Sequence, residues 1–211
     1  MSRLRRFIMI ARHPSAMRGP ASNLQRSGVT QASEQLIALL GHAFDGKAIR
    51  DVLAGWEVKR VAAPNSPLSE SIVWIPKASV RIDVYRPPQL SKLTATARAA
   101  QADDWLIGSV ELLAPGSDSR IKAPFPGLLP QGLSMQSTPQ ACIDAYGEPD
   151  LDEEHERPGF SGRVLAWRLQ TTNRAITFAG LGDDSVMIGY TACLIGCIGA
   201  WRSTQPEIFA P

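Results

Sequence analysis

The sequence has few cysteines and no basic tract. Its three cysteines, Cys142, Cys193 and Cys197, are an odd number and form no Cys-x-x-Cys motif. This favours free thiols in a reducing compartment over a disulfide framework. Its 22 basic and 20 acidic residues are spread along the chain, which makes nucleic acid an unfavoured partner.

The apolar segments are short. Arg3, Arg5 and Arg6 precede an apolar run, but residues 7–11 are fewer than the roughly 7–15 apolar residues of an export signal. Residues 186–201 are interrupted by glycines and fall short of the roughly 20 residues that span a bilayer. We therefore expect a soluble, cytoplasmic protein with no membrane partner.

A length of 211 residues suits one large α/β domain over residues 1–211, with an insertion rich in proline and glycine at about 116–162. A domain of this size buries roughly 70% of its unfolded surface and needs no covalent or metal staple. The histidines, His13, His42 and His155, have no acidic or cysteine partners at ligand spacing. We expect no metal and no cofactor.

The most informative stretch covers residues 7–41. Residues 7–10 form a short apolar run that is typical of a buried strand, and Arg12-His13-Pro14 follows it. Apolar residues then recur at helical spacing from Val29 to Leu40. Arg12 and His13 are thus predicted at the carboxyl end of a strand, where open α/β sheets bind their ligands.

This stretch resembles the start of the histidine phosphatase superfamily, which includes phosphoglycerate mutases and bacterial phosphohistidine phosphatases. The family has Arg-His-Gly after its first strand and then a helix reading Leu-Thr-x-x-Gly-x-x-Gln-Ala. Here the counterparts are Arg12-His13-Pro14 and residues 24–32, LQRSGVTQA. The resemblance implies a phosphoglycerate mutase-like fold. That fold is a three-layer α/β/α sandwich with a mostly parallel central sheet, in which residues 7–10 and 186–189 lie close together.

The resemblance also implies a set of site residues. His13 would be the nucleophile beside Arg12, and Glu111 matches an acidic residue of the phosphohistidine phosphatase branch. Glu70 stands where the family has a second arginine, and Tyr190 stands where it has a second histidine. We assign His13, Glu70, Glu111 and Tyr190 as catalytic candidates, and Arg12, Ser15, Arg18 and Thr191 as ligand-binding candidates.

The two replacements argue against efficient phosphate ester hydrolysis, because removal of one preorganised charge contact costs about 100–1000-fold in rate. Each candidate also has a structural alternative. His13 could be a hydrogen-bonded strand-end residue, Tyr190 a buried aromatic residue, and Glu70 a surface or helix-start residue.

Three functions remain open. The first is a degenerate superfamily member whose pocket around Arg12 and His13 binds a phosphorylated or anionic small molecule. The second is the same fold catalysing another reaction, with Tyr190 and Glu70 as acid or base groups. The third is a non-enzymatic, antitoxin-like or regulatory scaffold that binds a protein partner, or a second copy of itself. Residues 129–150 resemble a helix-and-loop unit of small bacterial inhibitor-like proteins.

The spacing of apolar residues, together with capping and turn residues, predicts the remaining elements. A helix is expected after Thr138 as cap and Pro139 at its first position, with Gly147 behind its last turn. Strands are expected over residues 57–63, 80–85 and 185–189, helices over 90–106, 162–179 and 192–201, and a solvated acidic loop over 150–156.

Overall fold

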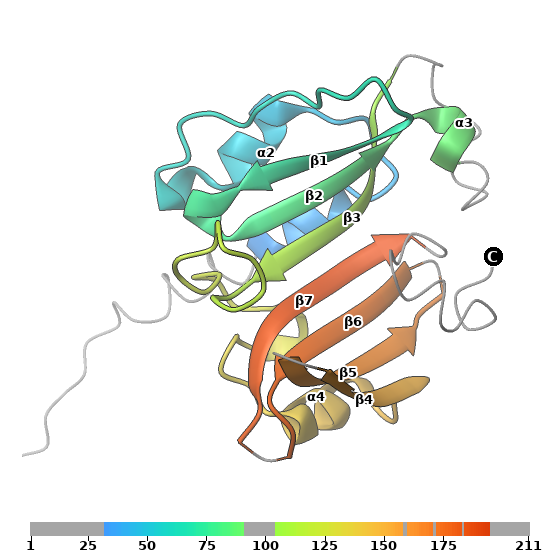
Figure 1. Cartoon of the computed structure of the whole chain (residues 1–211). Helices are drawn as coiled ribbons and strands as arrows, with labels where there is room; N and C mark the ends of the chain where they lie inside the picture. The colour runs from blue at the N-terminus through green and yellow to red at the C-terminus, as the bar shows by residue number, and fades with distance from the viewer. Residues whose placement is uncertain (1–31, 91–103, 158–159, 171, 183, 195–211) are drawn as a thin grey trace, which may run out of the picture.

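The computed structural model describes residues 32–90, 104–157, 160–170, 172–182 and 184–194. Over these residues the chain forms a seven-stranded sheet with short helices behind it (Figure 1). The strand order is β1-β2-β3-β7-β6-β5-β4, and neighbouring strands are antiparallel throughout.

The sheet consists of two meanders that meet at their last strands. The first meander is β1 (Glu70–Ile75), β2 (Val80–Tyr85) and β3 (Leu106–Leu113). The second is β4 (Leu151–Arg157), β5 (Phe160–Arg168), β6 (Thr172–Ala179) and β7 (Val186–Leu194). Because β3 pairs with β7, the edge strands of the whole sheet are β1 and β4.

The helices are short: residues 32–38 and α2 (Gly46–Val52) precede the first meander, α3 (Pro87–Leu90) lies between β2 and β3, and α4 (Pro139–Tyr146) precedes the second meander. The chain also has 3₁₀ turns η1 (Ala54–Trp56), η2 (Pro76–Ala78) and η4 (Pro130–Gly132). The prediction of α4 is confirmed: the Thr138 hydroxyl accepts from the Ala141 N–H at 3.2 Å, and Gly147 ends the helix with φ 83°. A positive φ favours glycine at this position.

Strand β2 shows how the sheet separates its two faces. Val80, Ile82 and Val84 are buried in the main core, which also holds Leu36 and Ile49 from the helical segments. The residues between them point to the opposite face, since side chains alternate along a strand. That second face carries a smaller buried cluster in which Tyr85, Leu106, Leu151, Ala166, Ala175 and Cys193 take part.

The expected parallel three-layer sandwich is wrong. Each strand pair in the sheet is antiparallel, and α2 and α4 lie on one face of it, whereas Leu90 of α3 is buried in the cluster of the other face (Figure 1). The strand expected over residues 7–10 lies outside the described residues. Its expected neighbour, residues 186–189, does form part of β7, but that strand lies between two antiparallel partners.

Two helix predictions also fail on residues that form strands. Residues 162–179 are not a helix but most of β5 and all of β6, joined by a turn in which the Leu169 N–H donates to the Thr172 carbonyl at 2.9 Å. Apolar residues on both faces of β5 hid the two-residue period. Strand β7 continues to Leu194, so no helix begins at 192.

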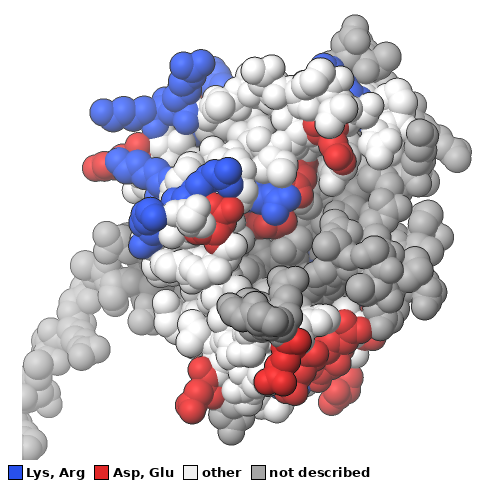
Figure 2. Space-filling view, viewed as in Figure 1, with Lys and Arg blue, Asp and Glu red and all other residues white. Residues whose placement is uncertain are grey.

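Two loop-and-strand assignments are reversed. Residues 58–63 carry no regular structure, whereas 151–157 form the edge strand β4 instead of a loop. Figure 2 shows the acidic residues of this region gathered where Figure 1 places β4. Like charges on an edge strand oppose pairing with another sheet edge. The acidic run on β4 therefore protects this edge of the sheet from intermolecular pairing.

Candidate functional site

The face of the sheet opposite the main core carries a row of side chains across four strands. The register places Trp74 of β1 beside Arg81 of β2, Arg81 beside Glu111 of β3, and Glu111 beside Thr191 of β7. Residues directly opposite each other in neighbouring strands share a face, so these four side chains line one side of the sheet.

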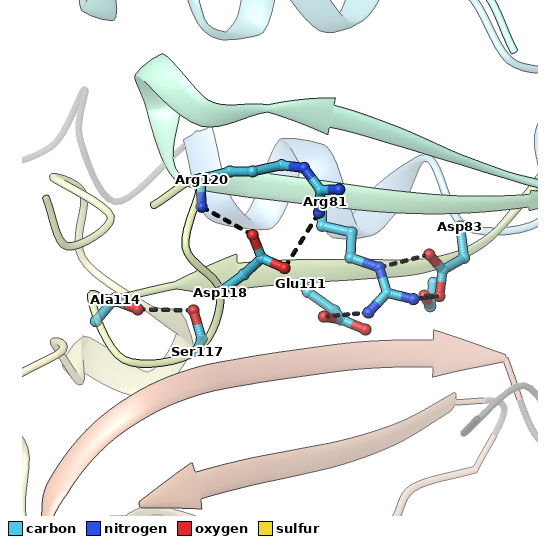
Figure 3. A network of polar contacts seen from close by, with 8 residues as sticks. Arg81, Asp83, Glu111, Ala114, Ser117, Asp118 and Arg120 are labelled. Atoms are coloured by element: carbon cyan, nitrogen blue, oxygen red, sulfur yellow. Dashed lines mark hydrogen bonds and ion pairs between the residues drawn. The ribbon is translucent and has the colours of Figure 1, made fainter. Parts of the chain in front are cut away.

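Arg81 is the centre of this row and contacts two carboxylates. Its Nε and Nη2 donate to the two oxygens of Asp83 at 2.9 and 3.1 Å, and its Nη1 donates to Glu111 Oε2 at 3.3 Å (Figure 3). Ser109 Oγ donates to Asp83 Oδ2 at 3.1 Å. The side chains of Arg81, Asp83 and Glu111 are 27%, 14% and 19% exposed, so the cluster is mostly shielded from water.

Burial changes the protonation of both acids. It raises the pKa of Glu111 to about 7, against the opposing effect of Arg81, and it raises the pKa of Asp83 as well. Asp83 has the two-pronged contact with Arg81 and the Ser109 hydroxyl, whereas Glu111 has one longer bond. As the pH falls toward neutral, Glu111 is therefore protonated before Asp83.

Trp74 lies beside two guanidinium groups. The Arg81 guanidinium carbon is 5.5 Å from the Trp74 ring centroid, and that of Arg120 is 4.6 Å from it. Arg120 comes from the loop after β3, where its Nη1 and backbone N–H both donate to Asp118, at 3.1 and 2.8 Å (Figure 3). We name the set Trp74, Arg81, Asp83, Glu111 and Arg120 the Trp74 surface.

The sequence-predicted site residues do not form one site in the described residues. Arg12, His13, Ser15 and Arg18 lie outside them. Glu111 and Thr191 are direct cross-strand neighbours on the face of the Trp74 surface. Glu70 is exposed at the start of β1 and shares that face through its pairing with Tyr85.

Tyr190 lies on the other side of the sheet. Its side chain is fully buried in the main core, and its hydroxyl forms a 2.8 Å hydrogen bond with the hydroxyl of Tyr146 in α4. Burial raises the pKa of Tyr190 well above its ordinary value, so the phenol stays neutral at physiological pH. Since Glu70 and Tyr190 occupy opposite faces, they cannot act on one bound molecule as a joint acid–base pair.

Sequence reasoning missed Trp74, Arg81, Asp83 and Arg120. The sequence pattern could have identified two of them. Arg81 and Asp83 alternate with apolar residues in the strand over residues 80–85, which was predicted correctly. Period-two alternation assigns both to the face opposite the apolar residues. Arg120 gave no such signal, because its position depends on how the loop after β3 folds back.

The described residues offer little metal-binding chemistry. Among residues 32–90, 104–157 and the later described stretches, no group of three or more His, Cys, Asp and Glu side chains is placed to hold a metal ion. In the Trp74 surface, Arg81 occupies the position between the two carboxylates that a cation would take.

Comparison with known proteins identifies no relative: no family model, no curated protein and no solved structure matches the chain. Within the described part of the chain, no helix is long and apolar enough to cross a membrane.

Proposed function

We propose that this chain is a non-enzymatic protein-binding module whose heterologous protein partner docks on the Trp74 surface. The observation that carries the proposal is the tryptophan flanked by two arginines on the sheet face opposite the main core. Tryptophan and arginine are the residue types that dominate binding energy in protein interfaces.

The surface is preorganised for binding. Arg81 is fixed by two carboxylates, and Asp118 holds Arg120 at the rim. Side chains that are already ordered lose less conformational entropy when a partner binds. Ile72, which is 49% exposed and lies on the same face through its pairing with Asp83, extends the apolar part of the surface.

The same contacts argue against a phosphorylated or anionic ligand at this surface. Both guanidinium groups have carboxylate partners, and Arg81 has two. An incoming phosphate would therefore meet at least as much negative as positive charge. The antiparallel fold also removes the structural ground for transferring phosphatase chemistry to this chain.

The partner chemistry follows from what the surface leaves exposed. Trp74 and Ile72 offer apolar area, and Arg120, whose side chain is 55% exposed, offers donors at the rim. A matching partner presents an apolar side chain to Trp74 and neutral carbonyl acceptors to Arg120.

The test begins with the photocrosslinking residue p-benzoylphenylalanine at position 72 in living cells. Position 47 on α2 is the matched control, because Lys47 is also exposed but belongs to the helical side. The proposal expects one heterologous protein crosslinked from position 72 and not from position 47. A crosslink to a second copy of this chain, or none specific to position 72, overturns it.

The captured protein is then purified and its affinity measured by calorimetry. Trp74→Ala should weaken binding about 30-fold, the effect of a typical hot spot, and Arg120→Ala should weaken it about 5-fold. Lys47→Ala should leave the affinity unchanged. Thermal melting checks that Trp74→Ala is folded, and the rim variant Arg120→Ala gives a second measurement with little risk to the fold. Unchanged affinity in both variants contradicts the proposal.

A further inference from the structure

A separate pocket lies at the end of the sheet where β3 ends and β7 begins. Its volume is about 440 Å³, within the roughly 300–1,000 Å³ of small-molecule sites. Its walls come from residues 114–115 after β3, from 185–187 at the start of β7, and from Pro124 and residues 135–137 between them.

Three hydrogen bonds hold the pocket walls, one between backbone groups and two between a serine hydroxyl and the backbone. The Ala114 N–H donates to the Ile188 carbonyl at 2.9 Å, which ties the end of β3 to β7. The Ala114 carbonyl accepts from Ser117 Oγ at 2.7 Å (Figure 3). On the opposite wall, the Ser134 N–H donates to Ser137 Oγ at 3.0 Å. The pocket is therefore formed before any ligand binds.

The lining selects against charge. None of the residues that line the pocket is ionisable, and most of its surface is apolar. Met135 and Met187 contribute two thioethers, which pack favourably against aromatic rings because sulfur is polarizable.

One polar group of the lining has no partner. Ser185 is only 7% exposed, and its Oγ makes no hydrogen bond with any described residue. A buried hydroxyl without a partner costs free energy, and the Ser185 Oγ is closed to solvent in the ligand-free chain. A ligand atom recovers that cost once rotation about χ1 of Ser185 turns the hydroxyl into the pocket.

We infer that this pocket binds a small neutral aromatic molecule carrying one hydrogen-bonding group, with the ring between Met135 and Met187 and the polar group paired with Ser185. This site is independent of the Trp74 surface, because none of the five residues of that surface lines it.

The test uses phenol and toluene, two single-ring probes that differ by one hydroxyl group. Binding is followed by NMR of protein labelled with ¹³C at the methionine methyl groups. The chain has five methionines, so Met1, Met9 and Met17 serve as reference signals for the two in the pocket. The signals of Met135 and Met187 are assigned with leucine variants, a volume-conserving exchange.

Phenol should shift the Met135 and Met187 signals saturably, with a Kd at or below about 1 mM. Ser185→Ala should weaken phenol about 5-fold, the effect of one hydrogen bond, and leave toluene unchanged. Gln136→Trp, at an exposed lining position, should block both probes, whereas Gln140→Trp, exposed and outside the lining, should block neither.

Three results would overturn the inference. The first is the absence of saturable shifts with either probe. The second is equal movement of all five methionine signals, which indicates nonspecific binding. The third is an equal change in the affinities of phenol and toluene in Ser185→Ala, which would show that the Ser185 hydroxyl does not recognise the phenol hydroxyl. Thermal melting shows whether Gln136→Trp is folded. If it is not, the comparison of phenol and toluene binding to Ser185→Ala tests the inference.

Discussion

Arg81 lies between two carboxylates that share one guanidinium, and this arrangement makes folding stability depend on pH. Burial raises the pKa of Glu111 from 4.5 to about 7. Between these values the folded chain holds a proton that the unfolded chain has lost, so the free energy of unfolding falls as pH rises. One pKa unit corresponds to about 1.4 kcal/mol, so the loss is about 3–4 kcal/mol and is complete above about pH 7.

Glu111→Gln should remove this dependence, because glutamine stays neutral and still accepts from Arg81. Urea unfolding at a series of pH values should show a flatter profile between pH 5 and 7, and a variant more stable than the parent at pH 8. Glu34→Gln, which removes a charge from an exposed helical residue, should leave the profile unchanged. A parental profile for Glu111→Gln would show that this carboxyl is not the titrating group.

The tyrosine pair predicts a coupled effect on stability. Tyr190→Phe and Tyr146→Phe each remove one hydroxyl from the 2.8 Å hydrogen bond in the core. Each should lower the free energy of unfolding by about 1–2 kcal/mol, since the remaining hydroxyl loses its tyrosine partner and keeps only Arg174. The double variant should cost less than the sum of the two, by roughly 1 kcal/mol. Strict additivity in urea unfolding would show that the two hydroxyls do not interact energetically.

At the scale of elements, α4 depends on the residue that caps its N-terminus, Thr138. Thr138 holds the N–H of Ala141, which would otherwise lack a partner in the first turn. Thr138→Ala should therefore cost about 1 kcal/mol and lower Tm by about 2–4 °C, whereas Thr138→Ser should recover most of the loss. Calorimetric melting measures both. Equal loss in the two variants would assign the effect to the methyl group of threonine instead of its hydroxyl.

The same helix shows what the sequence could reveal about the fold. Thr138, Pro139 and Gly147 act through local backbone chemistry, so their pattern alone predicted α4. Strand β2 was also predictable, because one of its faces is apolar and the other polar. Strand β5 was not, since Val164 and Ala166 are buried on one face while Leu165 and Trp167 are buried on the other. Burial on both faces removes the alternation that separates a strand from a helix.

The candidate site was predictable only in part. The resemblance singled out Glu111 and Thr191, and the sheet places them side by side. It also singled out Tyr190, one residue away, which a strand necessarily turns to the opposite face. Pairing of β3 with β7 joins residues far apart in sequence, and no local pattern encodes that register. Arg120 depends on the same kind of long-range information.

At the scale of the whole molecule, the two meanders share one core. The main cluster joins Ile82 and Leu112 of the first meander to Ile176 and Tyr190 of the second. We therefore expect a single cooperative transition in calorimetry, with slowest amide hydrogen exchange in β3 and β7 and faster exchange in the edge strands β1 and β4. Two separate transitions, or slowest exchange at an edge, would contradict a shared core.

The order of strands also bears on how the chain is made. Strand β3 leaves the ribosome about 70 residues before β7, its neighbour in the sheet. At roughly 5–20 residues per second, the nascent chain carries β3 without that partner for about 4–15 seconds. During this time the inner edge of the first meander, rich in Leu112, Val110 and Ile107, is open to other nascent chains. The topology thus makes β7 both the last of the described strands to be synthesised and the one that covers this edge of β3 against cotranslational aggregation.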